Sequence, residues 1–254
     1  MKARFLTYIL VAMLLAAQCL PAAAQSRKNP KDTVITMAQD SATISGTVGK
    51  NGKKILKYPP YHMIGVQYSY DISGISFSPD ITPKSTLQPI NMAVLYTCYM
   101  SLWDMMPYFG IQTGVRYATE GFTSGWNNCN GTYKVLEAPL ISQFNYRIGP
   151  IRILLDGGCY WGYRLSVSRI LTDDYTGETT TSTSFDSNDI REDYGFIFGG
   201  GFGIILGPVE LHLEANYKRS MCSVYQTTKI SDEYWLFGYG HQIRFSAGIN
   251  IHIF

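Results

Sequence analysis

The sequence predicts an all-β fold: an eight-stranded antiparallel up-and-down transmembrane β-barrel with long extracellular loops. Three observations predict it: an amino-terminal secretion signal, eight segments that alternate apolar and polar residues, and connections that alternate short and long. The clearest alternating segment is residues 209–219, where Leu211 and Leu213 alternate with Glu210 and His212. Successive side chains of a strand point to opposite faces, so one face of this segment is apolar and the other is charged. In a membrane barrel the apolar face contacts lipid and the polar face lines the lumen.

The amino terminus predicts export from the cytoplasm. Lys2 and Arg4 precede an apolar run in residues 5–20, and three alanines at 22–24 form a cleavage site. We therefore predict a signal peptide in residues 1–24. Its removal takes away two basic residues and changes the balance from 21 basic and 19 acidic residues to 19 of each. A neutral mature chain gives no reason to expect nucleic acid as a partner.

Residues 25–59 are polar and lack a sustained alternation. This composition predicts a periplasmic tail that is mostly disordered. Asn51-Gly52 is a hairpin turn signal between two short alternating segments. A lone hairpin is only marginally stable in water, so this element is expected to be either transient or docked.

Residues 60–254 form the predicted barrel domain. Its eight predicted strands are residues 62–72, 90–102, 108–118, 133–146, 151–167, 193–206, 209–219 and 239–253. In the mature chain no further apolar run reaches the length of a membrane-spanning helix, which excludes a helical membrane protein.

The connections between these strands alternate in length. The short ones are residues 103–107, 147–150 and Gly207-Pro208, and the long ones are 73–89, 119–132, 168–192 and 220–238. Outer-membrane barrels have short periplasmic turns and longer extracellular loops. With the amino terminus in the periplasm, every short connection lies on the periplasmic side. One such strand alone would fit a soluble β-sandwich, but the shared phase of the loops favours the membrane barrel.

The two faces of the predicted strands differ in composition. Side chains expected on lipid include Val66, Tyr70, Val94, Leu140, Leu155, Phe198, Leu213 and Phe245. The charged side chains expected in the lumen are Arg116, Glu137, Arg152, Asp156, Arg164, Asp193, Glu210, His212, Glu214, Lys218 and Arg244. An eight-stranded barrel is only wide enough for its own side chains, so we interpret the charged set as a plug. A polar channel or a buried acid–base site is the alternative.

The middle of the chain carries a family resemblance. The segment YKVLEAPLISQFNYRIGPIRILLDGGCYWGYRL, residues 133–165, has a Leu-Glu-x-Pro-Leu strand, a short turn and a Gly-rich strand that ends in Gly-Tyr. The matching residues are Leu136, Glu137, Pro139 and Leu140, then Gly157, Gly158, Gly162 and Tyr163. This pattern resembles the PorT-like outer-membrane β-barrel domains of Bacteroidota, over residues 61–254. The resemblance implies a membrane barrel with an accessory role in protein export across the outer membrane.

Two groups of residues are weighed as chemical sites. His241 is the candidate catalytic residue, but its same-face neighbour Ile243 is no nucleophile, so we predict an interfacial histidine. His212 between Glu210 and Glu214 could form a metal site, and we predict a salt-bridge network instead. No catalytic, cofactor-binding or metal-binding residue is therefore predicted.

The cysteines suggest one further pairing. Cys129 and Cys222 lie in the second and fourth outer loops, where they could form a disulfide over the barrel mouth. Cys98 and Cys159 are expected on the lipid faces of non-adjacent strands and cannot pair.

The predicted function is a non-enzymatic integral barrel of the cell outer membrane of a diderm bacterium, with an accessory, export or surface-interaction role. Its expected partners are outer-membrane lipid, the barrel assembly machinery during biogenesis, and a protein bound through the outer loops or the periplasmic tail. An outer-membrane enzyme acting on lipid A or peptides and a narrow passive pore are the alternatives.

Overall fold

The computed structural model describes residues 35–37, 44–48, 54–57, 61–78, 83–102, 106–124, 130–172, 176–187, 189–226 and 237–253. The predicted signal peptide lies outside these residues. Across the described ranges, no helix has the length and apolar character needed to cross a membrane.

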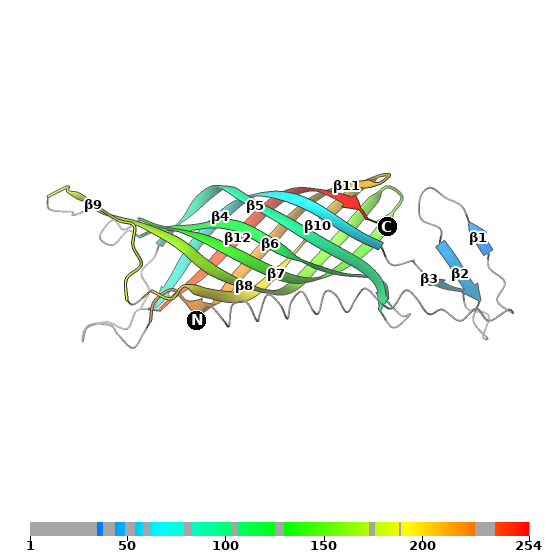
Figure 1. Ribbon diagram of the computed structural model, residues 1–254, viewed down its shortest axis with the longest axis horizontal. Helices are drawn as coiled ribbons and strands as arrows, with labels where there is room; N and C mark the ends of the chain where they lie inside the picture. Colours follow the sequence, from blue (N-terminus) through cyan, green and yellow to red (C-terminus); the bar gives the residue numbers. More distant parts are fainter. Residues whose placement is uncertain are drawn as a thin grey trace.

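Eight antiparallel strands form one closed barrel, in which the strands slant across the long axis (Figure 1). They are β4 (Tyr61–Ser78), β5 (Pro83–Leu102), β6 (Met106–Ser124), β7 (Asn130–Ile148), β8 (Ile151–Thr172), β10 (Glu192–Leu206), β11 (Val209–Ser223) and β12 (Phe237–His252). Each pairs with its neighbour in the chain, and β12 pairs with β4 to close the ring. The predicted eight-stranded up-and-down barrel is confirmed.

Two of the predicted short turns have the tightest geometry. Ile148 pairs with Ile151, and Leu206 pairs with Val209, so each turn has only two residues between its strands. The first of the two is a glycine with positive φ, 60° at Gly149 and 68° at Gly207. A glycine in this position suits a type II′ hairpin turn, whose twist matches that of the flanking strands. The third predicted short connection, residues 103–107, lies partly outside the described residues.

The strands are longer than the sequence predicts at the end opposite these turns, the outer end. β4 continues to Ser78, β5 begins at Pro83, and β8 runs for 22 residues to Thr172. A membrane-spanning strand needs only about 9–11 residues. The predicted loops 73–89, 119–132 and 168–192 therefore begin or end as strand. Main-chain pairing continues beyond the membrane, where the apolar alternation that marks a strand in the sequence is no longer required.

The lipid-facing set is confirmed by exposure. Val66 is 61% exposed, Leu155 63% and Phe245 52%, although all three are large and apolar. The side chains that alternate with them are buried. Cys159 is exposed as predicted, but Cys98 is only 3% exposed and does not reach the lipid surface.

Three short strands precede the barrel: β1 (Ile35–Met37), β2 (Ile44–Val48) and β3 (Lys54–Lys57). They form a separate antiparallel sheet in the order β1-β2-β3. Val48 pairs with Lys54, so β2 and β3 pair across the Asn51-Gly52 turn signal. The hairpin prediction thus agrees with the strand pairing, while Asn51 and Gly52 themselves lie outside the described residues.

Candidate functional site

The lumen of the barrel contains the candidate site. All eleven charged side chains predicted for it are buried: Arg116, Glu137, Arg152, Asp156, Arg164, Asp193, Glu210, His212, Glu214, Lys218 and Arg244. Strand alternation places these side chains on the inner face, opposite the exposed apolar set. Because a buried charge is costly without a partner, the pairing of these groups decides what the lumen can do.

Glu137 of β7 is the centre of the network. Its carboxylate accepts a hydrogen bond from Lys218 of β11 at 2.5 Å and one from Arg244 of β12 at 3.2 Å. Lys218 also pairs with Glu120 of β6 and lies 3.4 Å from a carboxylate oxygen of Asp193 on β10. These contacts join strands on opposite sides of the ring, so they cross the lumen and hold its walls together.

A second set of contacts extends from Arg244 toward β4. Its Nε donates to Oδ2 of Asp71 at 3.0 Å, and Gln242 donates to the same oxygen at 2.7 Å. Arg116 of β6 donates to Oε1 of Gln67 at 2.5 Å, and Gln67 donates to Glu214 at 2.9 Å. Polar side chains of β4, β6, β11 and β12 thus pair with one another within the lumen.

Glu210 organises the end of the lumen near the short turns. Its carboxylate lies 3.1 Å from Nη2 of Arg152, 3.1 Å from Nε2 of His212 and 2.7 Å from Nε2 of His252. The Arg152 guanidinium also stacks 4.7 Å from the ring centre of Tyr99. Gly203 faces the His212 ring, and an added Cβ there would lie 2.9 Å from that ring, so glycine makes the room that the network needs.

The predicted Glu210–His212–Glu214 salt-bridge network is present. Nδ1 of His212 lies 3.4 Å from Oε1 of Glu214, opposite the contact with Glu210. Among the described residues, no group of three or more histidine, cysteine, aspartate or glutamate side chains is arranged to hold a metal ion. Arg152 lies beside Glu210 and takes up the position from which a cation would approach that carboxylate.

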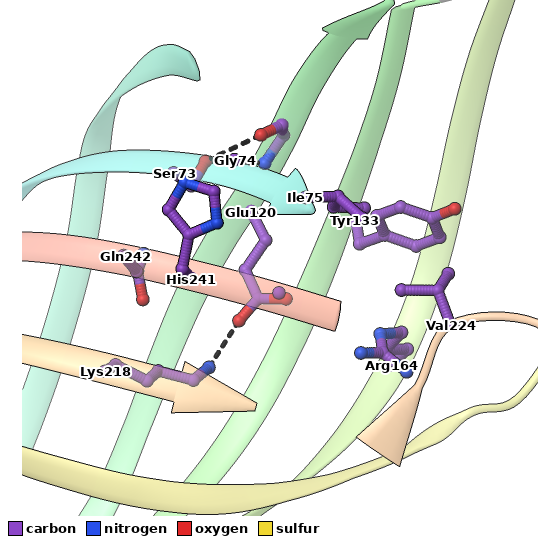
Figure 2. Close-up of a pocket in the computed structure, with 12 residues that line it drawn as sticks. Ser73, Gly74, Ile75, Glu120, Tyr133, Arg164, Lys218, Val224, His241 and Gln242 are labelled. Atoms are coloured by element: carbon purple, nitrogen blue, oxygen red, sulfur yellow. Dashed lines mark hydrogen bonds and ion pairs between the residues drawn. The ribbon is translucent and has the colours of Figure 1, made fainter. Parts of the chain in front are cut away.

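An apolar cluster closes the outer end of the lumen. Its buried members are Ile75, Phe122, Tyr133, Val135, Val167 and Val224, with Phe77, Phe185 and Tyr225 packed against them. Beside it, Glu120, Lys218 and Gln242 line a cavity of about 10 Å³ (Figure 2). That volume is the room of about one water molecule. The described side chains of the lumen therefore form a packed plug beside this cavity.

The third outer loop folds back onto this cluster. Arg164 donates to the carbonyl oxygens of Ile190 at 2.9 Å and Glu192 at 3.1 Å, and it pairs with Asp193 at 3.2 Å. Backbone N–H of Ile190 donates to the carbonyl of Val224 at 2.9 Å. The polar sequence of residues 173–189 predicts a mobile loop with almost no apolar residue to order it, but Phe185 is such a residue and packs on the apolar cluster.

Sequence reasoning missed two members of the luminal network, Asp71 and Glu120. Asp71 is 0% exposed and pairs with Arg244, while Glu120 pairs with Lys218. Asp71 lies on the inner face of a predicted strand, so the alternation alone could have identified it. Glu120 lies two residues beyond the predicted end of its strand, where the lipid-facing alternation has already stopped.

His241 has a hydroxyl neighbour that its own strand does not supply. Nδ1 of His241 lies 3.3 Å from Oγ of Ser76 on β4, which is 165 residues away in the chain. Oγ of Ser76 also accepts a hydrogen bond from Nη1 of Arg219 at 3.3 Å. A catalytic histidine needs a carboxylate to orient it, and here a guanidinium lies nearby instead. The geometry does not complete a hydrolytic triad.

Of the two cysteines in the predicted disulfide, the structure describes only Cys222. Cys222 is half-buried, and its thiol lies 3.5 Å from the carbonyl oxygen of Ser223. Cys129 lies outside the described residues, so its predicted disulfide with Cys222 stays a prediction.

Comparison with known proteins gives structural neighbours only. No protein-family model and no curated protein matches this chain. Neisserial surface protein A aligns with a TM-score of 0.38 and 11% identity, over 76% of this chain and 96% of that chain. Ail, the attachment invasion locus protein of Yersinia pestis, solved in complex with the heparin analogue sucrose octasulfate, aligns with a TM-score of 0.36 and 13% identity, over 75% of this chain and 99% of that chain. The fold assignment rests on the strand pairing described above.

The packed lumen predicts that the native protein does not conduct ions. The charged groups pair across the lumen, and the apolar cluster covers their outer end. In planar-bilayer recording we expect no stable conductance steps from the purified protein, while a known porin in the same bilayer serves as the positive control. Discrete, reproducible steps from the native protein would contradict the plug and restore the passive-pore alternative.

Proposed function

We propose that this protein is a non-enzymatic integral barrel of the cell outer membrane of a diderm bacterium that presents its outer strand ends and third loop to a protein partner. The observation that carries this proposal is the attachment of the described parts of the third loop to the outer strand ends. The strands continue beyond the apolar residues that face lipid. Described parts of the third loop pair with these outer strand ends. Such an arrangement gives a partner a rigid surface, which lowers the entropy lost on binding.

The support for the third loop comes from both of its ends. On the β8 side, β9 (Thr179–Ser182) pairs with the outer end of β8, from Thr172 opposite Thr179 to Arg169 opposite Ser182. On the β10 side, Asp189 forms a β-bridge with Tyr225 and an ion pair with Arg169. The two attachments hold the tip of the loop at the end of the barrel opposite the carboxyl terminus (Figure 1).

The exposed surface of this loop is polar. Residues 176–181 are all exposed, and they include four threonines and Glu178. Hydroxyl and carboxylate groups offer hydrogen-bond acceptors, so the fitting partner surface is rich in N–H donors and basic side chains. An export-accessory role, as the PorT-like resemblance implies, is compatible with such a surface and belongs to the same proposal.

The other two functional classes have less support. The paired charges and the apolar cluster argue against a passive pore. The Arg219 guanidinium beside Ser76 and His241 argues against a hydrolase, because a carboxylate would be needed in that position.

A loop deletion tests the proposal in intact cells. Removing residues 176–182 takes away the exposed tip and β9 but leaves Phe185 in the apolar cluster. We expect this variant to assemble normally, as seen by faster migration of folded than boiled protein, and to lose crosslinks to its protein partner. A photoreactive residue at Thr180 reports the partner, and one at Val94, on the membrane face, is the control.

A second deletion separates loss of binding from loss of structure. Removing residues 176–187 also takes away Phe185, so we expect added protease to cut the remaining loop more readily in this variant than after the shorter deletion. The proposal is wrong if Thr180 captures no protein in the native chain, or if crosslinking from other outer-loop sites is unchanged by the shorter deletion. Cleavage of this loop only after the periplasm is opened would reverse the topology.

A further inference from the structure

One sector of the outer rim differs from the rest of the lipid-facing surface. On β4, β12 and β11, the outward side chains Ile72, Ile243 and Tyr217 pair in one row of the sheet. The next outward row is Gly74, His241 and Arg219, which pair in the same way. β12 and β11 thus change from an apolar to a polar outward residue at the same level, beside Gly74 of β4, and this is the level expected for the change from hydrocarbon to headgroups.

The polar groups of this row converge. Oγ of Ser76 lies 3.3 Å from Nδ1 of His241 and 3.3 Å from Nη1 of Arg219. Gly74 has no side chain, and an added Cβ would lie 2.8 Å from Nε2 of His241 and 2.8 Å from Oγ of Ser85. The glycine therefore leaves the space in which the imidazole and two hydroxyls meet. The four groups come from four strands: β4, β5, β11 and β12.

The charge of this cluster is positive. Within the described part of the chain, Arg219 forms no ion pair with a carboxylate, and its hydrogen bond goes to the neutral hydroxyl of Ser76. A guanidinium beside hydroxyl and imidazole groups matches the oxygens of a phosphate, which accept several hydrogen bonds at once. The cluster is half-buried, so a phosphate bound there is partly shielded from bulk water.

An apolar groove lies below the cluster, on β4, β11 and β12 and on the neighbouring strand β10. It has a volume of about 400 Å³. Its sides are formed by Tyr68, Tyr70, Phe202 and Phe245, and small residues, Gly200, Ala215 and Ala247, form its floor. Phe245 is four residues from His241 along β12, which is about 13 Å along the strand and, with a strand tilt of about 40°, about 10 Å toward the membrane centre.

The positions of the cluster and the groove match the two parts of one ligand. One leaflet of the hydrocarbon core is about 15 Å thick, so a groove about 10 Å below the headgroup level lies at the depth of acyl chains. A free phosphate ion would contact only the polar cluster, whereas a lipid would contact both the cluster and the apolar groove. We propose that this wall binds a phosphate-bearing lipid of the outer leaflet, with its phosphate on Arg219, His241 and Ser76 and an acyl chain in the groove.

Native mass spectrometry of the full-length mature barrel tests the site with three probes: lipid A with its phosphates, lipid A without them, and inorganic phosphate. We expect the phosphate-bearing lipid to bind, and Arg219→Gln to reduce its bound fraction about tenfold. Lys134→Gln is the matched control, because Lys134 is an exposed cation on β7, the strand opposite β12 in the ring. It should leave binding unchanged.

The groove is tested separately. Ala247→Trp fills its floor and should reduce lipid binding to a similar extent, whereas Val115→Trp, on the lipid face of β6, should not. If Ala247→Trp does not fold, Ala215→Leu fills the same groove with a smaller side chain. The proposal is overturned if both lipid A forms bind equally, if the control variants reduce binding as much, or if inorganic phosphate competes while groove filling has no effect.

Discussion

Replacing Glu137 by glutamine is expected to destabilise the barrel by about 1–3 kcal/mol, because the change removes the carboxylate that two buried cations share, while Lys218 keeps Glu120 and Arg244 keeps Asp71. Glu137 is 1% exposed and accepts hydrogen bonds from Lys218 and Arg244. Glutamine has nearly the same shape, so the packing of the lumen stays and the lost charge dominates the effect. The amide would also place N–H donors beside donors that are already present.

The measurement is the urea dependence of unfolding in detergent micelles, followed by the shift between folded and unfolded bands. Glu178→Gln is the control, because Glu178 is an exposed carboxylate of the third loop. We expect the control to change stability by less than about 0.5 kcal/mol. Equal midpoints for the two variants would show that Glu137 does not hold the luminal network together.

The second large effect is expected on the opposite face of the wall. Leu213→Arg should destabilise the barrel by about 2–4 kcal/mol, because it places a cation on the lipid face near the middle of the membrane. Leu213 is 48% exposed and pairs with Ala247 on one side and Phe202 on the other. Refolding into lipid vesicles over a urea series measures the change.

Met221→Arg is the depth control for this prediction. Met221 lies on the same strand as Leu213, is 54% exposed, and is located beyond the rim row that contains Arg219. We expect a cost of about 0–1 kcal/mol there, because the side chain reaches the headgroups and water. A similar cost at both positions would mean that the apolar belt has been placed at the wrong height.

The structure changes one expectation for the lumen. From the sequence alone, Glu210→Gln should cost less than Leu213→Arg unless Glu210 is the sole partner of a buried arginine. Within the described residues, Glu210 is the carboxylate that forms an ion pair with Arg152, and it also contacts His212 and His252. The exception therefore applies, and a small effect is no longer expected for this substitution.

Glu137 connects parts of the chain that are far apart in the sequence. This residue belongs to the Leu-Glu-x-Pro-Leu pattern of β7, and in the barrel it accepts from cations of β11 and β12. A pattern that looks local in the sequence thus includes a residue whose role depends on strands more than 80 residues away. Glu137 therefore connects three strands of the barrel through its two cationic partners.

The faces of the strands were predictable because they depend on local rules. Alternation with a period of two identified which residues of 209–219 face lipid, and Leu211, Leu213 and Tyr217 are indeed exposed. The two-residue turns at Gly149-Pro150 and Gly207-Pro208 were predictable for the same reason, since turn geometry depends on the residues within the turn.

The ends of the strands were not predictable in this way. Beyond the membrane the alternation of apolar and polar residues stops. Strand pairing there depends on backbone hydrogen bonds, which any residue except proline can form and which therefore cannot be recognised in the sequence. The continuation of β5 back to Pro83 and of β8 to Thr172 could be seen only in the folded chain. The position of Phe185 was not predictable either. It is a single apolar residue in a polar loop, and the apolar cluster against which it packs is formed by residues far away in the sequence.

The sequence alone determined the strand number, the inward and outward faces, and the identity of the charges that fill the lumen, because each of these follows from neighbouring residues. Only the tertiary structure decided which charge pairs with which, as with Glu137 and Lys218, and which polar groups meet at the rim, as with Ser76 and His241. Closing the ring brings β4 beside β12, and the stagger of the strands determines the level at which their residues meet. Both are properties of the closed barrel as a whole, and no segment of the chain contains them by itself.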